Sequence, residues 1–237
     1  MGSYLRVKIC GITNVADAVH AGLFGADAIG FNFYKGSPRY ITPEKAESIL
    51  QMGMFPFVEP IGIFVSFDMR SDLRVISNLK LCTVQLHEAD ENSGLTFLSN
   101  SLGVRLISAF SVSEKNDLER IKHFMAKCEE NACKLTAKGG PNAWSLPVAV
   151  LVDARVPGQF GGTGKTAPWE LLADFGIKVP IILAGGLTPE NVAEAVRIVR
   201  PYAVDVASGV ERSPGHKDAD KMKRLIENAR EAAERLQ

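Results

Sequence analysis

Strand-like and helix-like segments alternate about eight times along this chain, and this alternation restricts its fold more than any other feature. Apolar runs that suit buried strands are each followed by a stretch with helical spacing of its apolar residues. Three of those stretches open on the start signals Thr13/Asn14, Thr42-Pro43-Glu44 and Thr188-Pro189-Glu190. Eight such units predict a closed parallel α/β barrel, with an open doubly wound sheet as the weaker alternative.

The boundaries of these segments follow from the same patterns. Strands are expected at 5–10, 27–33, 59–65, 82–87, 104–109, 148–153, 179–184 and 202–206. Helices are expected at 14–24, 43–52, 68–79, 90–101, 113–127, 168–174, 189–198 and 217–236. Residues 127–146 interrupt the rhythm and are interpreted as a helix extension followed by a surface insertion. We otherwise expect residues 1–237 to form a single domain.

The charge balance argues against partners that bind through a strong overall field. Lys plus Arg and Asp plus Glu both number 27, so no net charge attracts nucleic acid or an anionic membrane. No apolar run approaches the roughly 18 residues of a membrane span, and no signal-peptide layout opens the chain. We therefore expect a cytoplasmic protein that binds a small-molecule substrate at a local site. The sequence leaves both a monomer and a homodimer open.

The four cysteines, Cys10, Cys82, Cys128 and Cys133, are too few and too scattered for a disulfide framework. Cys128 and Cys133 could pair with each other or join a metal site. No second close Cys/His pair completes a zinc site, so no metal is expected. Cys82 opens an apolar strand and is interpreted as a small core residue.

The first and sixth expected strands end on residues that could transfer protons. The active site of a parallel barrel forms where its strands end. Strand alternation places Lys8 and Cys10 on one face, and a nearby ammonium stabilises a thiolate. A cysteine at this position could equally be a small buried hydrophobe. Asp153 closes a wholly apolar strand, where partial desolvation suits a general acid.

Three further polar residues follow other strands. Arg39 lies in the loop after the second strand, and its planar guanidinium suits a carboxylate, although a solvated loop charge is the alternative. Gln85 and His87 share one face at the end of the fourth strand. We interpret these two as supporting residues on the inner rim of the barrel.

Two glycine turns follow the seventh and eighth strands, which is where barrels usually bind phosphate. Gly185 and Gly186 allow backbone amides to approach a ligand, and Ser208 and Gly209 could open a short helix. Two ordinary turns are the alternative. A third glycine cluster at 158–166 lacks the first glycine of a P-loop, and we interpret it as a mobile cover for the site.

Several segments together resemble the phosphoribosylanthranilate isomerase family. They are Lys8-Ile-Cys-Gly-Ile-Thr13, Gly25-Ala-Asp-Ala-Ile-Gly-Phe31, Ser37-Pro-Arg-Tyr-Ile41, Val84-Gln-Leu-His87, Gly161-Gly-Thr-Gly-Lys165, Ala184-Gly-Gly-Leu187 and Asp205-Val-Ala-Ser-Gly-Val-Glu211. The resemblance runs from residue 5 to about residue 228. It implies a (β/α)8, or TIM, barrel and an isomerase of tryptophan biosynthesis that uses no cofactor and no metal.

The resemblance also implies roles for individual residues. Cys10 would be the general base, Asp153 the general acid, and Arg39 the clamp on the anthranilate carboxylate. The residues implied to hold the substrate phosphate are Gly185, Gly186, Asp205, Ser208 and Gly209. The implied reaction is the Amadori rearrangement of N-(5-phosphoribosyl)anthranilate. Another phosphosugar-binding barrel enzyme and a non-catalytic phosphate-binding barrel are the alternatives.

Overall fold

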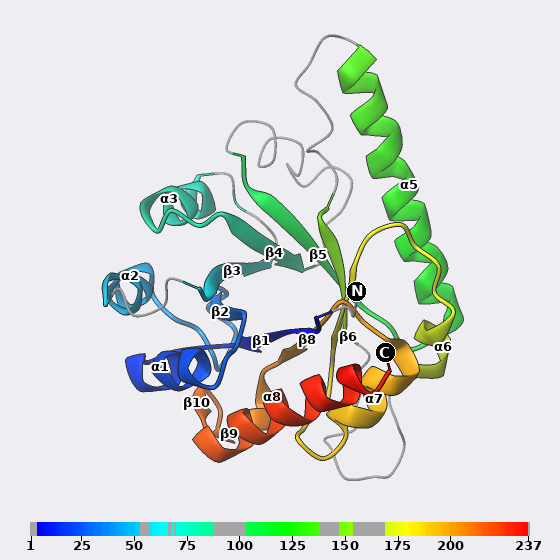
Figure 1. Cartoon of the computed structure of the whole chain (residues 1–237). Helices are drawn as coiled ribbons and strands as arrows, with labels where there is room; N and C mark the ends of the chain where they lie inside the picture. Colours follow the sequence, from blue (N-terminus) through cyan, green and yellow to red (C-terminus); the bar gives the residue numbers. More distant parts are fainter. Residues whose placement is uncertain are drawn as a thin grey trace.

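Eight parallel strands close into a barrel in the order β1 to β8 (Figure 1). The computed structural model describes residues 4–52, 57–65, 68, 70–87, 103–137, 147–153 and 169–236. The strands are β1 (Arg6–Cys10), β2 (Ala28–Asn32), β3 (Glu59–Val65), β4 (Thr83–His87), β5 (Arg105–Ser111), β6 (Ala149–Asp153), β7 (Ile181–Ala184) and β8 (Ala203–Val206). Because β8 also pairs in parallel with β1, the ring has no free edge. The expected (β/α)8 barrel is confirmed.

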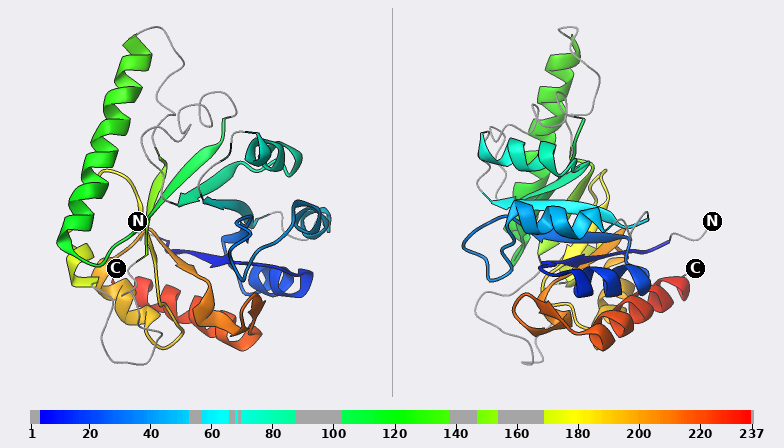
Figure 2. Two further views of the ribbon diagram at one scale, coloured as in Figure 1. Left: turned by 180° about the vertical axis from the view of Figure 1, so that it is seen from behind. Right: turned by 90° about the vertical axis from the view of Figure 1, so that its left-hand side faces the viewer.

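Helices surround the strands as an outer layer (Figures 1 and 2). They are α1 (Val15–Leu23), α2 (Pro43–Gln51), α3 (Ser71–Asn78), α5 (Lys115–Ala137), α6 (Trp169–Ala173), α7 (Val192–Val199) and α8 (Ala219–Glu234). The right-hand view of Figure 2 places both chain ends at the side where the strands begin. The ends of the strands therefore face the opposite side. Within the described ranges, no helix combines the length and the apolar character needed to cross a membrane.

Local capping explains where two of the helices begin. The side chain of Asn14 accepts a hydrogen bond from the Asp17 amide at 2.9 Å and caps α1. The Thr42 hydroxyl likewise accepts from the Lys45 amide, and Pro43 occupies the first turn of α2. Both helix starts were expected from the sequence and are confirmed.

Apolar side chains fill two separate layers of the barrel. Small and branched residues, among them Ala149, Leu151 and Ile182, form a cluster on the inner face of the strands. A larger cluster that includes Val7 and Ile9 packs between the strands and the helices. Since side chains alternate along a strand, residues two positions apart share a face. Asp153 therefore faces inward with Ala149 and Leu151.

The eight strands begin and end within two residues of their predicted bounds, but several other predictions need correction. Helix α7 begins at Val192 rather than at residue 189. Helix α5 continues to Ala137, which confirms the helix extension predicted after residue 127. Cys82 is exposed, because it lies in the turn before β4 rather than in the core. The helix predicted at 90–101 and the glycine cluster at 158–166 lie outside the described residues.

A short hairpin between β8 and the last helix was not predicted from the sequence. Strands β9 (Glu211–Ser213) and β10 (His216–Lys217) pair antiparallel, and Gly215 turns between them with φ of 79°. Lys217 was expected to start the last helix. Instead Asp218 caps α8 by accepting a hydrogen bond from the Lys221 amide at 3.0 Å, so the helix starts two residues later.

Candidate active site

Cys10 is the last residue of β1, and it faces the inside of the barrel, as does a buried network of polar residues. Lys8, two residues earlier, donates hydrogen bonds to the Gln85 side-chain oxygen Oε1 at 2.9 Å and to the Asp205 carboxylate at 3.0 Å. Cys10 itself is half-buried and lies opposite Gly30 of β2. A Cβ at Gly30 would lie 3.1 Å from the Cys10 sulfur, so this glycine provides the space for the thiol. The predicted neighbourhood of Lys8 and Cys10 is confirmed.

The protonation of Cys10 is set by opposing effects. Burial raises the pKa of the Cys10 thiol, and the negative charge of Asp205 raises it further. The positive charges of Lys8 and Lys217 lower this pKa but do not offset the first two effects. We expected the Lys8 ammonium to favour the thiolate, which it does. The net shift is nevertheless upward, so the resting protein holds mainly the thiol.

The charge of Lys8 itself is maintained by its partners. Burial lowers the pKa of Lys8, but the carboxylate of Asp205 and the neighbouring Cys10 outweigh that effect and the pKa is raised. Asp205 therefore belongs to an ion pair inside the barrel, where it faces Lys8. The side chain of Asp205 is thus occupied by Lys8, and the predicted contact of this residue with a phosphate stays a prediction.

Asp153 ends β6 and also faces inward at the carboxyl end of the barrel. Its neighbours in register are Ser111 of β5 and Ala184 of β7. Its backbone carbonyl accepts a hydrogen bond from Val112 at 3.0 Å, and its side chain is half-buried. Because Ala184 directly precedes Gly185, Asp153 stands next to the first glycine turn. In strand order β1 and β6 lie three positions apart around the ring, so Cys10 and Asp153 end different strands at the same end of the barrel.

Arg39 reaches the same end of the barrel from the loop after β2. Its guanidinium donates from Nε and Nη2 to the two oxygens of Glu211, at 2.8 and 2.7 Å. Its aliphatic part lies on Gly11, where a Cβ would be 2.5 Å from the Arg39 Cδ atom. The hydrogen bond with Glu211 raises the pKa of Arg39, although burial acts against it. The predicted carboxylate clamp thus already holds a carboxylate of the protein.

Lys217 completes this group of ionised side chains. Its ammonium is fully buried and donates to Glu211 at 2.9 Å and to the Ala207 carbonyl at 3.0 Å. Burial lowers the pKa of Lys217, and the charge of Glu211 opposes this effect. Among the described residues around Cys10, the three cations Lys8, Arg39 and Lys217 thus face two carboxylates.

The two glycine turns lie together beyond β7 and β8. Gly185 and Gly186 have φ values of 92° and 64°, which favour glycine. The Asn191 side chain accepts from the Thr188 amide and donates to the Gly186 carbonyl, which stabilises the first turn. Ser208–Val210 form the expected short helix, here of the 3₁₀ type. A Cβ at Gly209 would lie 1.7 Å from the Leu187 carbonyl oxygen, so the two turns are in close contact.

Gln85 and His87 occupy the inner rim of β4, as expected. Their Nε2 atoms lie 2.9 Å apart, and Gln85 also accepts the hydrogen bond from Lys8. Gln85 is buried and His87 is half-buried. Gln85 therefore connects the buried Lys8 with the residue that ends β4. A cavity of about 540 Å³ adjoins His87 on this side, and Asn32, Ser37 and Phe110 are among its lining residues.

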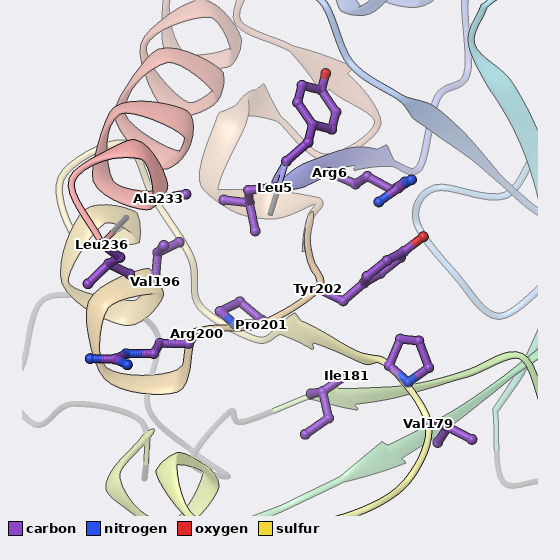
Figure 3. A pocket seen from close by; sticks show the side chains of 12 residues that line it. Leu5, Arg6, Val179, Ile181, Val196, Arg200, Pro201, Tyr202, Ala233 and Leu236 are labelled. Carbon is purple, nitrogen blue, oxygen red and sulfur yellow. The ribbon is translucent and has the colours of Figure 1, made fainter. Parts of the chain in front are cut away.

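Another cavity, of about 550 Å³, opens at the opposite end of the barrel (Figure 3). It is lined by residues at or before the starts of strands, such as Arg6 and Tyr202, together with side chains of α7 and α8. The Arg6 guanidinium lies over the Tyr202 ring, 4.4 Å from its centroid. This cavity therefore lies far from the strand ends that carry Cys10 and Asp153. Within the described ranges, no group of three His, Cys, Asp or Glu residues could hold a metal ion.

Two residues of the site were missed from the sequence. Glu211 was noticed only as the end of a motif, and Lys217 was assigned to a helix. The run Ser213-Pro214-Gly215 is a turn signal that could have predicted the hairpin. Nothing in the local sequence indicates that Arg39 would meet Glu211, which lies 172 positions later.

Comparisons with known proteins agree with the barrel fold. The family model described as N-(5'-phosphoribosyl)anthranilate (PRA) isomerase matches residues 7–228. The N-(5'-phosphoribosyl)anthranilate isomerase of Trichlorobacter lovleyi is 43% identical over 230 residues, which cover 96% of this chain and 99% of that protein. The crystal structure of the Thermotoga maritima phosphoribosyl anthranilate isomerase has 40% sequence identity and a TM-score of 0.75, and the match covers 95% of this chain and 98% of that chain.

A further solved structure shows such an enzyme with a ligand. It is a phosphoribosyl anthranilate isomerase in complex with reduced 1-(o-carboxyphenylamino)-1-deoxyribulose 5-phosphate, abbreviated rCdRP. It has 37% sequence identity and a TM-score of 0.71, and the match covers 95% of this chain and 98% of that chain.

Proposed function

Because this chain belongs to the N-(5'-phosphoribosyl)anthranilate isomerase family, we propose that its barrel mouth carries out an Amadori rearrangement with Cys10 as base and Asp153 as acid. The chain is an isomerase of tryptophan biosynthesis. The observation that carries the residue assignment is the placement of both side chains. Each is the last residue of a barrel strand, on the face that points into the barrel. The two strands, β1 and β6, are not neighbours in the ring.

The substrate carries an anion at each end, and the site offers a place for both. The phosphate would bind at the two glycine turns formed by Gly185, Gly186, Ser208 and Gly209, where Gly186 has open space around it and backbone amides could donate to the anion. The anthranilate carboxylate would bind Arg39, whose side chain is 22% exposed. Binding both ends would fix the ribose carbons between Cys10 and Asp153, so that binding energy holds the reacting atoms in a productive orientation.

The chemistry requires two proton transfers. Asp153 would protonate the ring oxygen of the ribose, so that the ring C1–O bond breaks and the nitrogen lone pair forms a Schiff base. The Cys10 thiolate would then remove the proton from C2, giving an enolamine. Tautomerisation of the enolamine yields the ketone, 1-(2-carboxyphenylamino)-1-deoxyribulose 5-phosphate. Lys8 and Lys217 would support the thiolate while it acts as the base.

The decisive experiment follows the fluorescence of phosphoribosylanthranilate, made in situ, as purified protein consumes it. We expect wild-type protein to remove the signal. Cys10→Ala and Asp153→Ala should each lower kcat by about 10² or more while the variants remain folded, the range for loss of a positioned acid or base. The double variant should lose less than the product of the two effects, because both residues serve one reaction sequence. Wild-type turnover in either single variant would reassign the chemistry.

A further inference from the structure

Glu211 occupies an unusual position, because it binds the residue that the proposed function assigns to the substrate carboxylate. Arg39 presents Nε and Nη2 to Glu211 in a two-bond arrangement. Within the part of the chain that the structure describes, the Nη1 group of Arg39 has no acceptor. The edge formed by Nη1 and Nη2 thus remains available to a second carboxylate.

Glu211 is itself held from several directions. The Lys217 ammonium donates to its Oε1 atom at 2.9 Å, and the Gly215 amide donates to the same atom at 3.3 Å. Burial raises the pKa of Glu211, but Arg39 and Lys217 outweigh that effect and the pKa is lowered. Glu211 is therefore an anion whose position is fixed by its donors.

The hairpin that carries Glu211 is attached to the barrel at separate points. The Lys217 amide donates to the Asp17 carboxylate of α1 at 2.8 Å. The Lys221 ammonium of α8 donates to the Glu211 carbonyl at 3.0 Å. The Thr13 hydroxyl, in the loop after β1, donates to the Gly215 carbonyl. These contacts make β9 and β10 a rigid support, and rigid support of a binding group reduces the free energy lost when a ligand binds.

We propose that Glu211 is a positioning residue that holds Arg39 with its remaining guanidinium edge toward the substrate carboxylate, and that Lys217 fixes Glu211 in this role. The proposal rests on the proposed function, since it takes the anthranilate carboxylate as the ligand of Arg39. The contrary possibility is that Glu211 only competes with the substrate for Arg39. The two possibilities predict opposite changes in affinity when the Glu211 charge is removed.

Glu211→Gln separates them. The amide nitrogen of Gln is a donor, and it would face the donors Arg39 and Lys217, so the guanidinium loses one of its two acceptors. If Glu211 positions Arg39, this variant should bind the carboxylate more weakly. If Glu211 competes with the substrate, the variant should bind it more tightly, because the positive charge of Arg39 is no longer neutralised.

The experiment measures the dissociation constants of two ligands by isothermal titration calorimetry. One ligand is rCdRP, and the other is its phenylamino counterpart, which lacks the carboxylate. We expect Glu211→Gln to raise the Kd for rCdRP about tenfold, the size of one charge-assisted hydrogen bond. The Kd for the counterpart should stay unchanged. In steady-state assays KM should rise by a similar factor, with kcat changed less.

Arg39→Ala and a matched control complete the design. Combined with Arg39→Ala, the Glu211→Gln change should weaken rCdRP binding no further, because both changes act through one guanidinium. Glu59→Gln is the control, since Glu59 also pairs with an arginine, Arg105, but at the opposite end of the barrel. It should alter neither Kd. Should Glu211→Gln fail to fold, Lys217→Met tests the same support, and it should raise the Kd for rCdRP alone.

An unchanged or tighter rCdRP affinity in a folded Glu211→Gln protein would overturn the proposal. Equal weakening for both ligands would also overturn it, because it would indicate a general distortion of the site. Failure of the proposed function looks different, since the wild-type protein would then bind neither ligand and leave phosphoribosylanthranilate unconsumed.

Discussion

Gly209→Ala should separate the two glycine turns by a distance that follows from the structure. The new Cβ would lie 1.7 Å from the Leu187 carbonyl oxygen, 2.8 Å from the Leu187 carbonyl carbon and 3.2 Å from the Thr188 Cα. All three are backbone atoms, so no side-chain rotation can relieve the overlap. Restoring a separation of 3.0 Å requires the turns to move apart by about 1.3 Å.

A displacement of that size should reduce catalysis strongly if the turns bind the substrate phosphate. A misplacement of about 1 Å in a positioning element can cost about 10² in rate, and overpacking typically costs about 1–3 kcal/mol of stability. We therefore expect kcat/KM to fall about 10²-fold, with a lower melting temperature. The assays are turnover of phosphoribosylanthranilate, calorimetric binding of inorganic phosphate and thermal unfolding.

Two other glycines provide controls. Gly186 has φ of 64° and open space around it, so Gly186→Ala adds backbone strain of about 1–2 kcal/mol without pushing the turns apart. Gly176, in the loop after α6, has neither constraint, and Gly176→Ala should be neutral. The reasoning is refuted if Gly209→Ala retains the wild-type kcat/KM and phosphate affinity, or if Gly176→Ala loses as much.

Four further predictions concern the ionised groups of the site. Arg39→Ala should chiefly raise KM in steady-state assays, and an unchanged KM would show that the carboxylate is held elsewhere. The kcat/KM of the wild-type protein should rise with pH, because the base is the thiolate. The rise should continue to a pH above the ordinary thiol pKa of about 8.5, because burial raises the pKa of Cys10. Lys217→Met should move that rise to higher pH, whereas a change at the exposed Lys223 should not; coinciding pH profiles would contradict the role of Lys217. The carboxyl of Glu211 has a lowered pKa in the folded protein, so its stabilising contribution is complete above the unfolded value of about 4.3 and is lost as pH falls through the lower folded value. Urea unfolding in acid should therefore show a shallower dependence on pH in Glu211→Gln, and an identical dependence would count against the pairing.

The amino-acid sequence alone determined the barrel and the ends of its strands. Alternating apolar runs and helix starts such as Asn14 and Thr42 act over a few residues, so their effects can be read directly from neighbouring positions. Strand alternation was also enough to place Lys8 and Cys10 on one face, and Asp153 at a strand end. The phosphoribosylanthranilate isomerase family could be identified from short motifs for the same reason.

Only the tertiary structure decided how the charges of the site are paired. Asp205 meets Lys8 across 197 positions of sequence. Burial of Cys10, together with the charge of Asp205, raises the pKa of the Cys10 thiol despite the neighbouring Lys8. Arg39 meets Glu211 across 172 positions of sequence, and Glu211 lies on a hairpin that the helical and strand periodicity of the sequence did not predict. Electrostatic effects depend on distance in space and on burial, and closure of the barrel sets both at once. Local sequence patterns contain neither quantity.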